Sequence, residues 1–267
     1  MYKITPEVQD SKETIVSKIN SLLEDSIKKT KGNIGVLFSG GLDSTLIAFY
    51  LKKNNIPFTC YTATLQDSTD YKWSKKVAKL LNLKHKIIII DNPEEYFKKS
   101  IKLLNSTNVV NIGIASTLLP ALEQAKKDNI NIMFLGSGSE DVFGGYARHV
   151  TSKNINEDCL NSLNSMKDRD FEREKILSET FNIKFLEPFL SEEIIKYGLR
   201  IPGKYKVQNN LGKYIIRELA LYLGLPEEIA FRKRLAAQYG SSMDKQMLKL
   251  AKKNNLKTKT SYLEKLK

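Results

Sequence analysis

Cysteine and histidine are scarce in this sequence. There are two of each, Cys60 and Cys159, His85 and His149, and they are far apart. Without a CxxC or a Cys/His cluster, a disulfide framework, a structural zinc and an iron–sulfur cluster are disfavoured. Two distant histidines also argue against a histidine-dependent triad. These absences fit a reducing, cytosolic compartment.

Long apolar runs are missing as well. No stretch of about 18 apolar residues occurs, as a membrane helix would need, and residues 1–6 do not have the charged-then-apolar pattern of a signal peptide. We therefore expect a soluble, cytoplasmic protein that does not use a membrane. With 41% hydrophobic and 27% charged positions among 267 residues, the chain can bury a sizeable core, which excludes disordered and collagen-like classes.

The charge balance is strongly basic. There are 43 Lys and Arg against 30 Asp and Glu, a net charge of +13, which is typical of proteins that bind RNA or DNA. Basic pairs such as Lys75-Lys76 and Lys98-Lys99 are, however, spread over helix faces, and an enzyme that handles polyanionic ATP also tolerates a basic surface. The charge therefore leaves both interpretations open.

The first half of the chain alternates between strands and helices. An amphipathic helix is expected within residues 7–30, since apolar positions recur there at helical spacing. Short apolar or β-branched runs predict four strands, at residues 33–38, 57–65, 86–90 and 130–135. Helical stretches separate them. This alternation indicates right-handed βαβ units and a mainly parallel, twisted sheet with helices on both faces.

After Tyr146 the pattern changes. Residues 150–180 are polar and charged, with no strand, and the remainder is predicted to be helical, with helices near 191–199 and 213–223, a short one after Gly224, and a last one from Met243. The predicted organisation is an N-terminal helix in 1–30, an α/β core in 31–150 and a helical C-terminal lobe in 151–267. A Lys/Asn-rich tail from about residue 252 is expected to be frayed and solvated.

A glycine-rich loop follows the first predicted strand, with the sequence Ser39-Gly40-Gly41-Leu42-Asp43-Ser44. Open α/β sheets bind ligands at this point, between the carboxyl end of a strand and the amino end of a helix. The two glycines let the backbone approach a pyrophosphate, which the Ser39 and Ser44 hydroxyls can help to bind. Asp43 supplies a hard oxygen ligand suited to Mg²⁺. There is no GK[ST], so the loop is not a Walker A motif.

A second motif, from Gly136 to Tyr146, follows the fourth predicted strand and reads GSGSEDVFGGY. It should therefore lie at the same edge of the sheet as the first loop. Its small residues allow close backbone approach, and Glu140 and Asp141 bring two carboxylates near the phosphates. Glu140 is the candidate for a second Mg²⁺ ligand.

The first loop resembles the PP-loop of the N-type ATP pyrophosphatases, whose fold is that of the adenine nucleotide alpha hydrolases. The second motif resembles that of the amide-forming C-terminal domain of asparagine synthetases. Three further segments match this family, Pro188-Phe189-Leu190, Leu199-Arg200-Ile201-Pro202 and Lys213-Tyr214-Ile215-Ile216-Arg217-Glu218, so that the resemblance runs from about residue 10 to about residue 245.

The resemblance implies a set of site residues. Ser39, Gly40, Gly41, Asp43 and Ser44 would bind ATP. Gly136 and the strand near Thr64 would contact the adenosine, and Asp43 and Glu140 would bind Mg²⁺. Lys213 would reach the pyrophosphate.

The sequence departs from the family pattern in three places. We expect no N-terminal glutaminase domain, because Tyr2 stands where its cysteine nucleophile would be. Ser137 replaces a glutamate thought to assist attack on the acyl-adenylate, and a serine cannot act as a carboxylate base. Arg234 stands where a charge-stabilising lysine is expected, with Lys233 as the neighbouring candidate. The acceptor-side residues 236–242 also differ.

The predicted reaction has two steps. A substrate carboxylate, with aspartate as the default, attacks the α-phosphate of Mg·ATP and releases pyrophosphate. Ammonia, another amine or ammonia from a separate glutaminase subunit then displaces AMP to form an amide. Two alternatives remain: an adenylating enzyme that modifies tRNA, and a degenerate ATP-binding partner of a separate amidotransferase. The oligomeric state is not predicted.

Overall fold

A five-stranded parallel sheet forms the centre of the computed structural model, which describes residues 6–166, 170–233 and 235–267. The strand order is β3-β2-β1-β4-β5 and every neighbouring pair is parallel. The strands are β1 (Ile34–Leu37), β2 (Phe58–Thr64), β3 (His85–Ile89), β4 (Ile132–Phe134) and β5 (Lys184–Leu186). The expected α/β class with a parallel sheet is thus confirmed, and the four predicted strands are β1 to β4.

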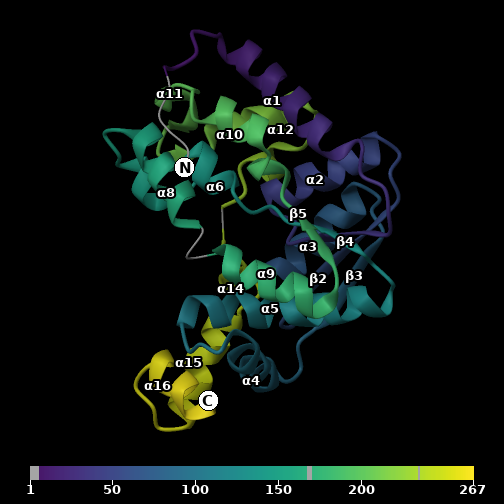
Figure 1. Ribbon diagram of the computed structural model, residues 1–267, viewed down its shortest axis with the longest axis vertical. Helices are drawn as coiled ribbons and strands as arrows, with labels where there is room; N and C mark the ends of the chain where they lie inside the picture. The colour runs from purple at the N-terminus through teal and green to yellow at the C-terminus, as the bar shows by residue number, and fades with distance from the viewer. Residues whose placement is uncertain (1–5, 167–169, 234) are drawn as a thin grey trace.

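Helices cover both faces of this sheet, as Figure 1 shows. One group comprises α1 (Lys12–Ile27), α2 (Leu42–Lys53), α3 (Thr69–Leu80), α10 (Glu192–Gly198), α12 (Tyr214–Tyr222) and α13 (Glu227–Ala230). The other comprises α4 (Pro93–Leu104), α5 (Val109–Lys127), α9 (Glu172–Phe181), α15 (Met243–Lys253) and α16 (Lys259–Leu266). Shorter or peripheral helices are α6 (Ser139–Phe143), α7 (Ala147–Val150), α8 (Ile155–Met166), α11 (Gly203–Lys206) and α14 (Ala237–Gly240).

Successive strand residues supply the two hydrophobic cores in turn. Val36 and Phe134 belong to the core under α1, α2 and α12, whereas Met133 and Leu135 belong to the core under α5, α9 and α15. Since side chains alternate across a strand, a strand buried on both faces must be apolar throughout. This explains why the strands read as unbroken apolar runs.

The fifth strand differs from the expectation that only helices follow Tyr146. Lys184, Phe185 and Leu186 pair in parallel with residues 132–134 of β4. The strand is three residues long and its side chains are only partly buried or exposed, because it lies at the edge of the sheet. A hairpin of β6 (Val207–Gln208) and β7 (Leu211–Gly212) was not expected either.

The C-terminal tail is also ordered, contrary to the expectation of a frayed segment. Residues 259–266 form α16, which packs against α4 and α15. Tyr262 is fully buried, its ring packs edge-on against Phe97, and its hydroxyl donates a 2.7 Å hydrogen bond to Glu94. Burial of this one aromatic side chain thus stabilises the helix although most residues around it in the sequence are polar. No described helix is long and apolar enough to cross a membrane.

Replacing Tyr262 with alanine should lower the free energy of unfolding by about 3 kcal/mol, because it removes a buried ring and leaves a cavity. Tyr222→Ala is the matched control, since that ring is 62% exposed, and should change stability by no more than about 0.5 kcal/mol. Urea unfolding measures both. Equal effects of the two substitutions would contradict the packing of α16.

Candidate active site

The loop between β1 and α2 is held in place by glycine and by the helix that follows it. Gly40 has a positive φ of +65°, and a Cβ there would lie 2.7 Å from the Trp73 carbonyl oxygen of α3. Only glycine fits both constraints. The Gly41 N–H donates to Ser39 Oγ at 3.2 Å, and Gly41 is the N-cap of α2. The amino end of α2 therefore opens at the carboxyl edge of the sheet, where an anion is stabilised.

The second motif places α6 beside this loop. Gly138 and Gly144 bracket the helix in left-handed conformations. A Cβ on Gly136 would lie 2.9 Å from Asp43 Cβ, and one on Gly145 would lie 2.7 Å from Glu140 Cγ. The small residues of this motif therefore allow two carboxylates from segments far apart in the sequence to approach each other.

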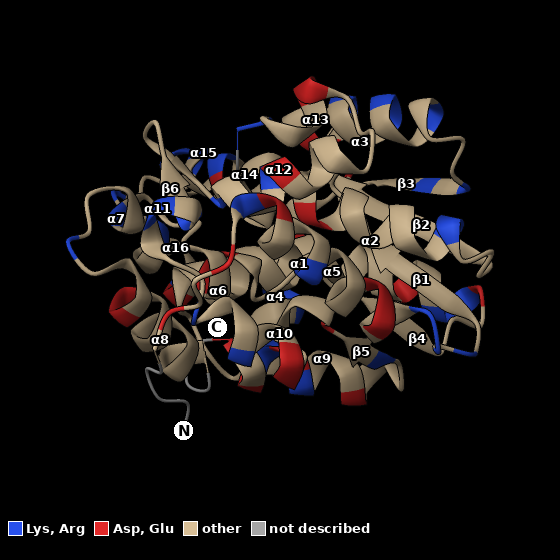
Figure 2. Cartoon of the chain, turned by 90° about the horizontal axis from the view of Figure 1, so that it is seen from above, with Lys and Arg blue, Asp and Glu red and all other residues tan. Residues whose placement is uncertain are grey.

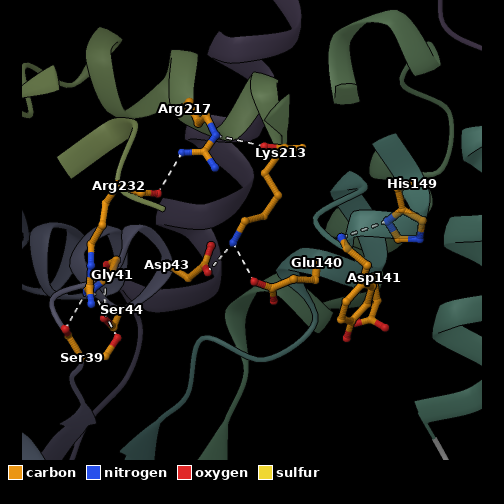
Figure 3. Close-up of polar contacts among 12 residues, drawn as sticks. Ser39, Gly41, Asp43, Ser44, Glu140, Asp141, His149, Lys213, Arg217 and Arg232 are labelled. Atoms are coloured by element: carbon orange, nitrogen blue, oxygen red, sulfur yellow. Dashed lines mark hydrogen bonds and ion pairs between the residues drawn. The ribbon is translucent and has the colours of Figure 1, made fainter. Parts of the chain in front are cut away.

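A cation from the C-terminal half joins them. Asn209 and Asn210, both at positive φ, form the turn of the β6–β7 hairpin, as asparagine at such positions favours. Directly after it, Lys213 adopts a left-handed conformation (φ 55°) as the N-cap of α12. Its Nζ lies 2.6 Å from Asp43 Oδ2 and 2.8 Å from Glu140 Oε1 (Figure 3).

The three charges depend on one another. Burial alone would lower the pKa of Lys213, but Asp43 and Glu140 outweigh it, so the pKa is raised and the ammonium is kept. Burial raises the pKa of Asp43, which the Lys213 cation opposes and the Glu140 charge reinforces. Asp43 Oδ1 is buried and has no hydrogen-bond partner among the described residues. The site thus holds a carboxylate oxygen ready for a further cation.

Two arginines brace the loops around these charges. Arg217 donates to the backbone carbonyls of Gly212 at 3.0 Å and Ala230 at 2.7 Å. Arg232 donates to the Ser39 carbonyl at 2.8 Å and to Asp70 Oδ1 at 2.9 Å, with its guanidinium 5.1 Å from the centre of the Trp73 ring. Figure 3 shows both arginines beside Lys213 and the first loop. The C-terminal half therefore fixes the loop that the N-terminal half provides.

A cavity of about 520 Å³ opens over these residues. Its lining includes Ser39, Gly41, Asp43, Ser44, Gly136, Glu140, Lys213, Arg217, Arg232 and Lys233. An apolar wall is added by Leu37, Ala63, Ile114, Leu118, Ala121 and Leu135. This combination of charged and apolar walls suits a ligand with a polyanionic end and an aromatic base.

Most of the predicted site residues come together here, but not all of them. Thr64 is fully buried and hydrogen-bonds to Ser68; the described cavity lining from β2 is Tyr61, Thr62 and Ala63 instead. Lys233 is exposed at the cavity, whereas Arg234 lies outside the described residues. Gly40 is buried against α3 and supports the loop from behind.

Several residues of the site were not predicted as such. Arg217 lies within the segment Lys213 to Glu218 that resembles the family, and Arg232 precedes Lys233 directly. Their closeness in the sequence to predicted site residues was the available signal. Arg173 and Glu174 also line the cavity, yet they lie in a polar stretch that has no motif. Their burial, at 5% and 6% exposure, appears only once α9 is packed against α5.

The sheet, the two glycine-rich loops and the buried lysine define a nucleotide-binding α/β domain, and its family follows from comparison. The family model described as "Asparagine synthase" matches residues 18–158 and 150–265. The chain therefore belongs to the asparagine synthase family, as its motifs predicted.

The relatives found have similar names. The chain is 28% identical to a putative glutamine-hydrolysing asparagine synthetase 1 of Methanocaldococcus jannaschii, over 92% of this chain and 53% of that protein. It is 26% identical to the glutamine-hydrolysing asparagine synthetase of Gallus gallus, over 85% of this chain and 44% of that protein. It thus spans about half the length of these relatives.

Solved structures with a similar course of the chain include the NMN synthetase of Francisella tularensis, at 17% identity and a TM-score of 0.47, covering 97% of this chain and 92% of that one. Another is the NH3-dependent NAD synthetase of Campylobacter jejuni, at 18% identity and a TM-score of 0.45, covering 96% and 92%.

Replacing Arg232 with methionine should leave the buried Asp70 carboxylate without its cationic partner. Burial raises the pKa of Asp70 to about 6 despite the opposing charge of Arg232. Above that pH, loss of the cation should lower the free energy of unfolding by about 3–5 kcal/mol. Without Arg232 the pKa of Asp70 should rise further, and since the cost comes from the ionised form, it should be smaller at pH 5, where Asp70 is protonated, than at pH 8.

Urea unfolding at pH 5 and pH 8 measures this. Lys233→Met, at the exposed neighbouring position, is the matched control, and adding Asp70→Asn to Arg232→Met should recover part of the loss. A destabilisation that is the same at both pH values would contradict the role given to Asp70.

Proposed function

We propose that the chain is an ATP-dependent, AMP- and pyrophosphate-forming ligase that adenylates a carboxylate and transfers ammonia or an amine to it. The observation that carries this proposal is the buried Asp43–Lys213–Glu140 cluster at the amino end of α2. It is supported by membership of the asparagine synthase family. Aspartate is the first acceptor to test, since the relatives are named for asparagine synthesis.

The chain's residues divide the work along the cavity. The amino end of α2, with Ser39, Gly41 and Ser44, would hold the phosphates. The apolar wall from Leu37, Ala63 and Leu118 would receive the adenine. Lys213 would move from the carboxylates to the pyrophosphate as it leaves, with Lys233 and Arg234 as further candidate cations.

The carboxylate oxygens fit Mg²⁺, because Asp43 Oδ1 is buried without a hydrogen-bond partner among the described residues and hard oxygen ligands suit this ion. Asp43 and Glu140 would hold it, with further ligands from the ATP phosphates, since the described residues contain no group of three or more His, Cys, Asp or Glu able to hold a metal. When bound, Mg²⁺ neutralises charge on the phosphates.

No specific observation favours the tRNA alternative. Figure 2 shows Lys and Arg on elements across the whole view, such as α3, β3 and α11, interleaved with Asp and Glu. In that view the positive charge does not single out one face as a binding surface for a polyanion. We therefore keep tRNA as one arm of the functional test.

Exchange of labelled pyrophosphate into ATP tests the proposal. With Mg²⁺ and a panel of amino-acid carboxylates that includes aspartate, we expect acceptor-dependent exchange. Asp43→Asn should reduce it by about 100-fold or more, because the variant loses a proposed ligand of the Mg²⁺ that neutralises charge on the phosphates. Asp67→Asn, at an exposed position with positive φ that asparagine also adopts, is the matched control and should retain exchange.

Exchange that requires total tRNA would contradict the small-carboxylate reaction and favour RNA modification. No pyrophosphate exchange with any acceptor, with and without an added glutaminase partner, would contradict the ligase. It would favour a degenerate ATP-binding site without catalytic activity.

A further inference from the structure

Three polar side chains meet beside the cavity. Ser137 follows β4, and Glu187 follows β5, so both lie at the carboxyl ends of neighbouring strands. Glu174 comes from the first turn of α9, which packs against β5. Ser137 Oγ donates to Glu174 Oε1 at 3.1 Å. Ser137 and Glu174 both line the cavity, with Glu187 behind them.

A proton shared by the two carboxyl groups accounts for their buried oxygens. As two anions, Glu174 Oε2 and Glu187 Oε1 would be buried without a hydrogen-bond partner among the described residues. A proton on one of them would let that carboxyl group donate to the other. A protonated buried pair of this kind avoids the large cost of two like charges in a poorly solvated position.

The surroundings place the titration of Glu174 close to neutral pH. Burial, and then the charge of Glu187, raise the pKa of Glu174 to about 8, against the opposing effect of Arg173, and Asp170 adds to the rise. Burial also raises the pKa of Glu187. Arg173 is itself held by Asn111 of α5 at 3.0 Å and by Asp170 at 3.0 Å. A general base with a pKa near the operating pH is the effective kind.

Other carboxylates of the cavity already have cations or hydroxyl donors. Asp43 and Glu140 share Lys213, Asp70 is paired with Arg232, and Asp141 accepts from the Tyr146 hydroxyl at 3.2 Å. Accepting a proton at any of these positions would weaken a contact that holds the phosphate end together. Glu174 Oε1 accepts from Ser137 at 3.1 Å and from Arg173 at 3.4 Å. Asn111 and Asp170 also hold that guanidinium, so protonation of Glu174 leaves Arg173 with these two partners.

We propose that Ser137 and Glu174 take up the proton that the attacking amine must lose, and that Glu187 positions Glu174 for this step. This inference rests on the proposed ligase function. The neutral amine attacks the carbonyl carbon of the acyl-adenylate and forms the C–N bond. The bond from that carbon to the AMP oxygen breaks, and AMP leaves with its electron pair. The surplus proton on nitrogen passes to Ser137 Oγ as Ser137 gives its own proton to Glu174.

This assignment separates the two half-reactions. Adenylation needs the Asp43, Glu140 and Lys213 end of the cavity, whereas amide formation needs the Ser137 and Glu174 end. Glu174→Gln keeps the size of the side chain and an oxygen that can accept from Ser137, but it cannot take a proton. A carboxylate that supports pyrophosphate exchange, with hydroxylamine as a nucleophile already uncharged at neutral pH, probes both halves.

In Glu174→Gln, acceptor-dependent exchange should stay within about threefold of the parent while kcat for hydroxamate formation falls by about 100-fold, the usual contribution of a general base. In the parent, that rate should rise as pH increases through the pKa of Glu174, and this rise should vanish in the variant. Glu174→Asp should recover part of the rate. Glu172→Gln, an exposed glutamate of the same helical turn, is the matched control and should leave both half-reactions unchanged.

Three results would overturn the inference. Unchanged hydroxamate formation in Glu174→Gln would show that the proton goes elsewhere, and equal loss of both half-reactions would indicate a structural role. Infrared spectroscopy gives a test that needs no substrate: a protonated carboxyl band at pH 7 should be present in the parent and lost in Glu174→Gln, and its absence from the parent would refute the shared proton. No exchange with any acceptor in the parent would instead contradict the ligase itself.

Discussion

The ammonium of Lys213 between Asp43 and Glu140 is the interaction on which the architecture of the site depends. It joins three segments: the start of α2, the α6 motif and the turn before α12. Removing one member of such a buried group leaves an uncompensated charge, a loss of about 3–5 kcal/mol in comparable cases. The lysine therefore holds two carboxylates close together, which repulsion and burial would otherwise prevent.

The left-handed backbone at Lys213 indicates that this position is determined by the surrounding fold. Strained conformations of this kind persist where neighbours fix them. Here Gly212 abuts the motif loop, since a Cβ on it would lie 2.4 Å from the Gly144 carbonyl oxygen, and Arg217 holds the Gly212 carbonyl. The same arginine reaches the chain before Arg232, which holds the first loop. Residues from 212 to 232 thus act as one brace across the sheet edge.

Sequence patterns predicted the parts of this structure whose causes are local. The apolar runs of β1 to β4 and the two glycine-rich loops carry their own signals, because burial on both faces and close backbone approach restrict the residue types. The edge strand β5 is too short and too exposed to stand out, and α16 depends on the single burial of Tyr262. Glu174 carries no local signal either, since its burial arises from the packing of α9 against α5. Ser137 stands in the second motif where the family has a glutamate, so the sequence showed where a carboxylate was missing. Only the fold shows that the Glu174 carboxyl group lies beside Ser137.

The two buried thiols allow the two halves of the chain to be followed separately. Cys60 lies in the middle of β2 and Cys159 in α8, and both are fully buried, with pKa values raised by burial. A thiol reacts as the exposed thiolate, so each can be labelled only when its own surroundings open. Labelling rates therefore report local opening of the sheet and of the segment behind the second motif independently. A ligand that bridges the two loops should slow both rates together.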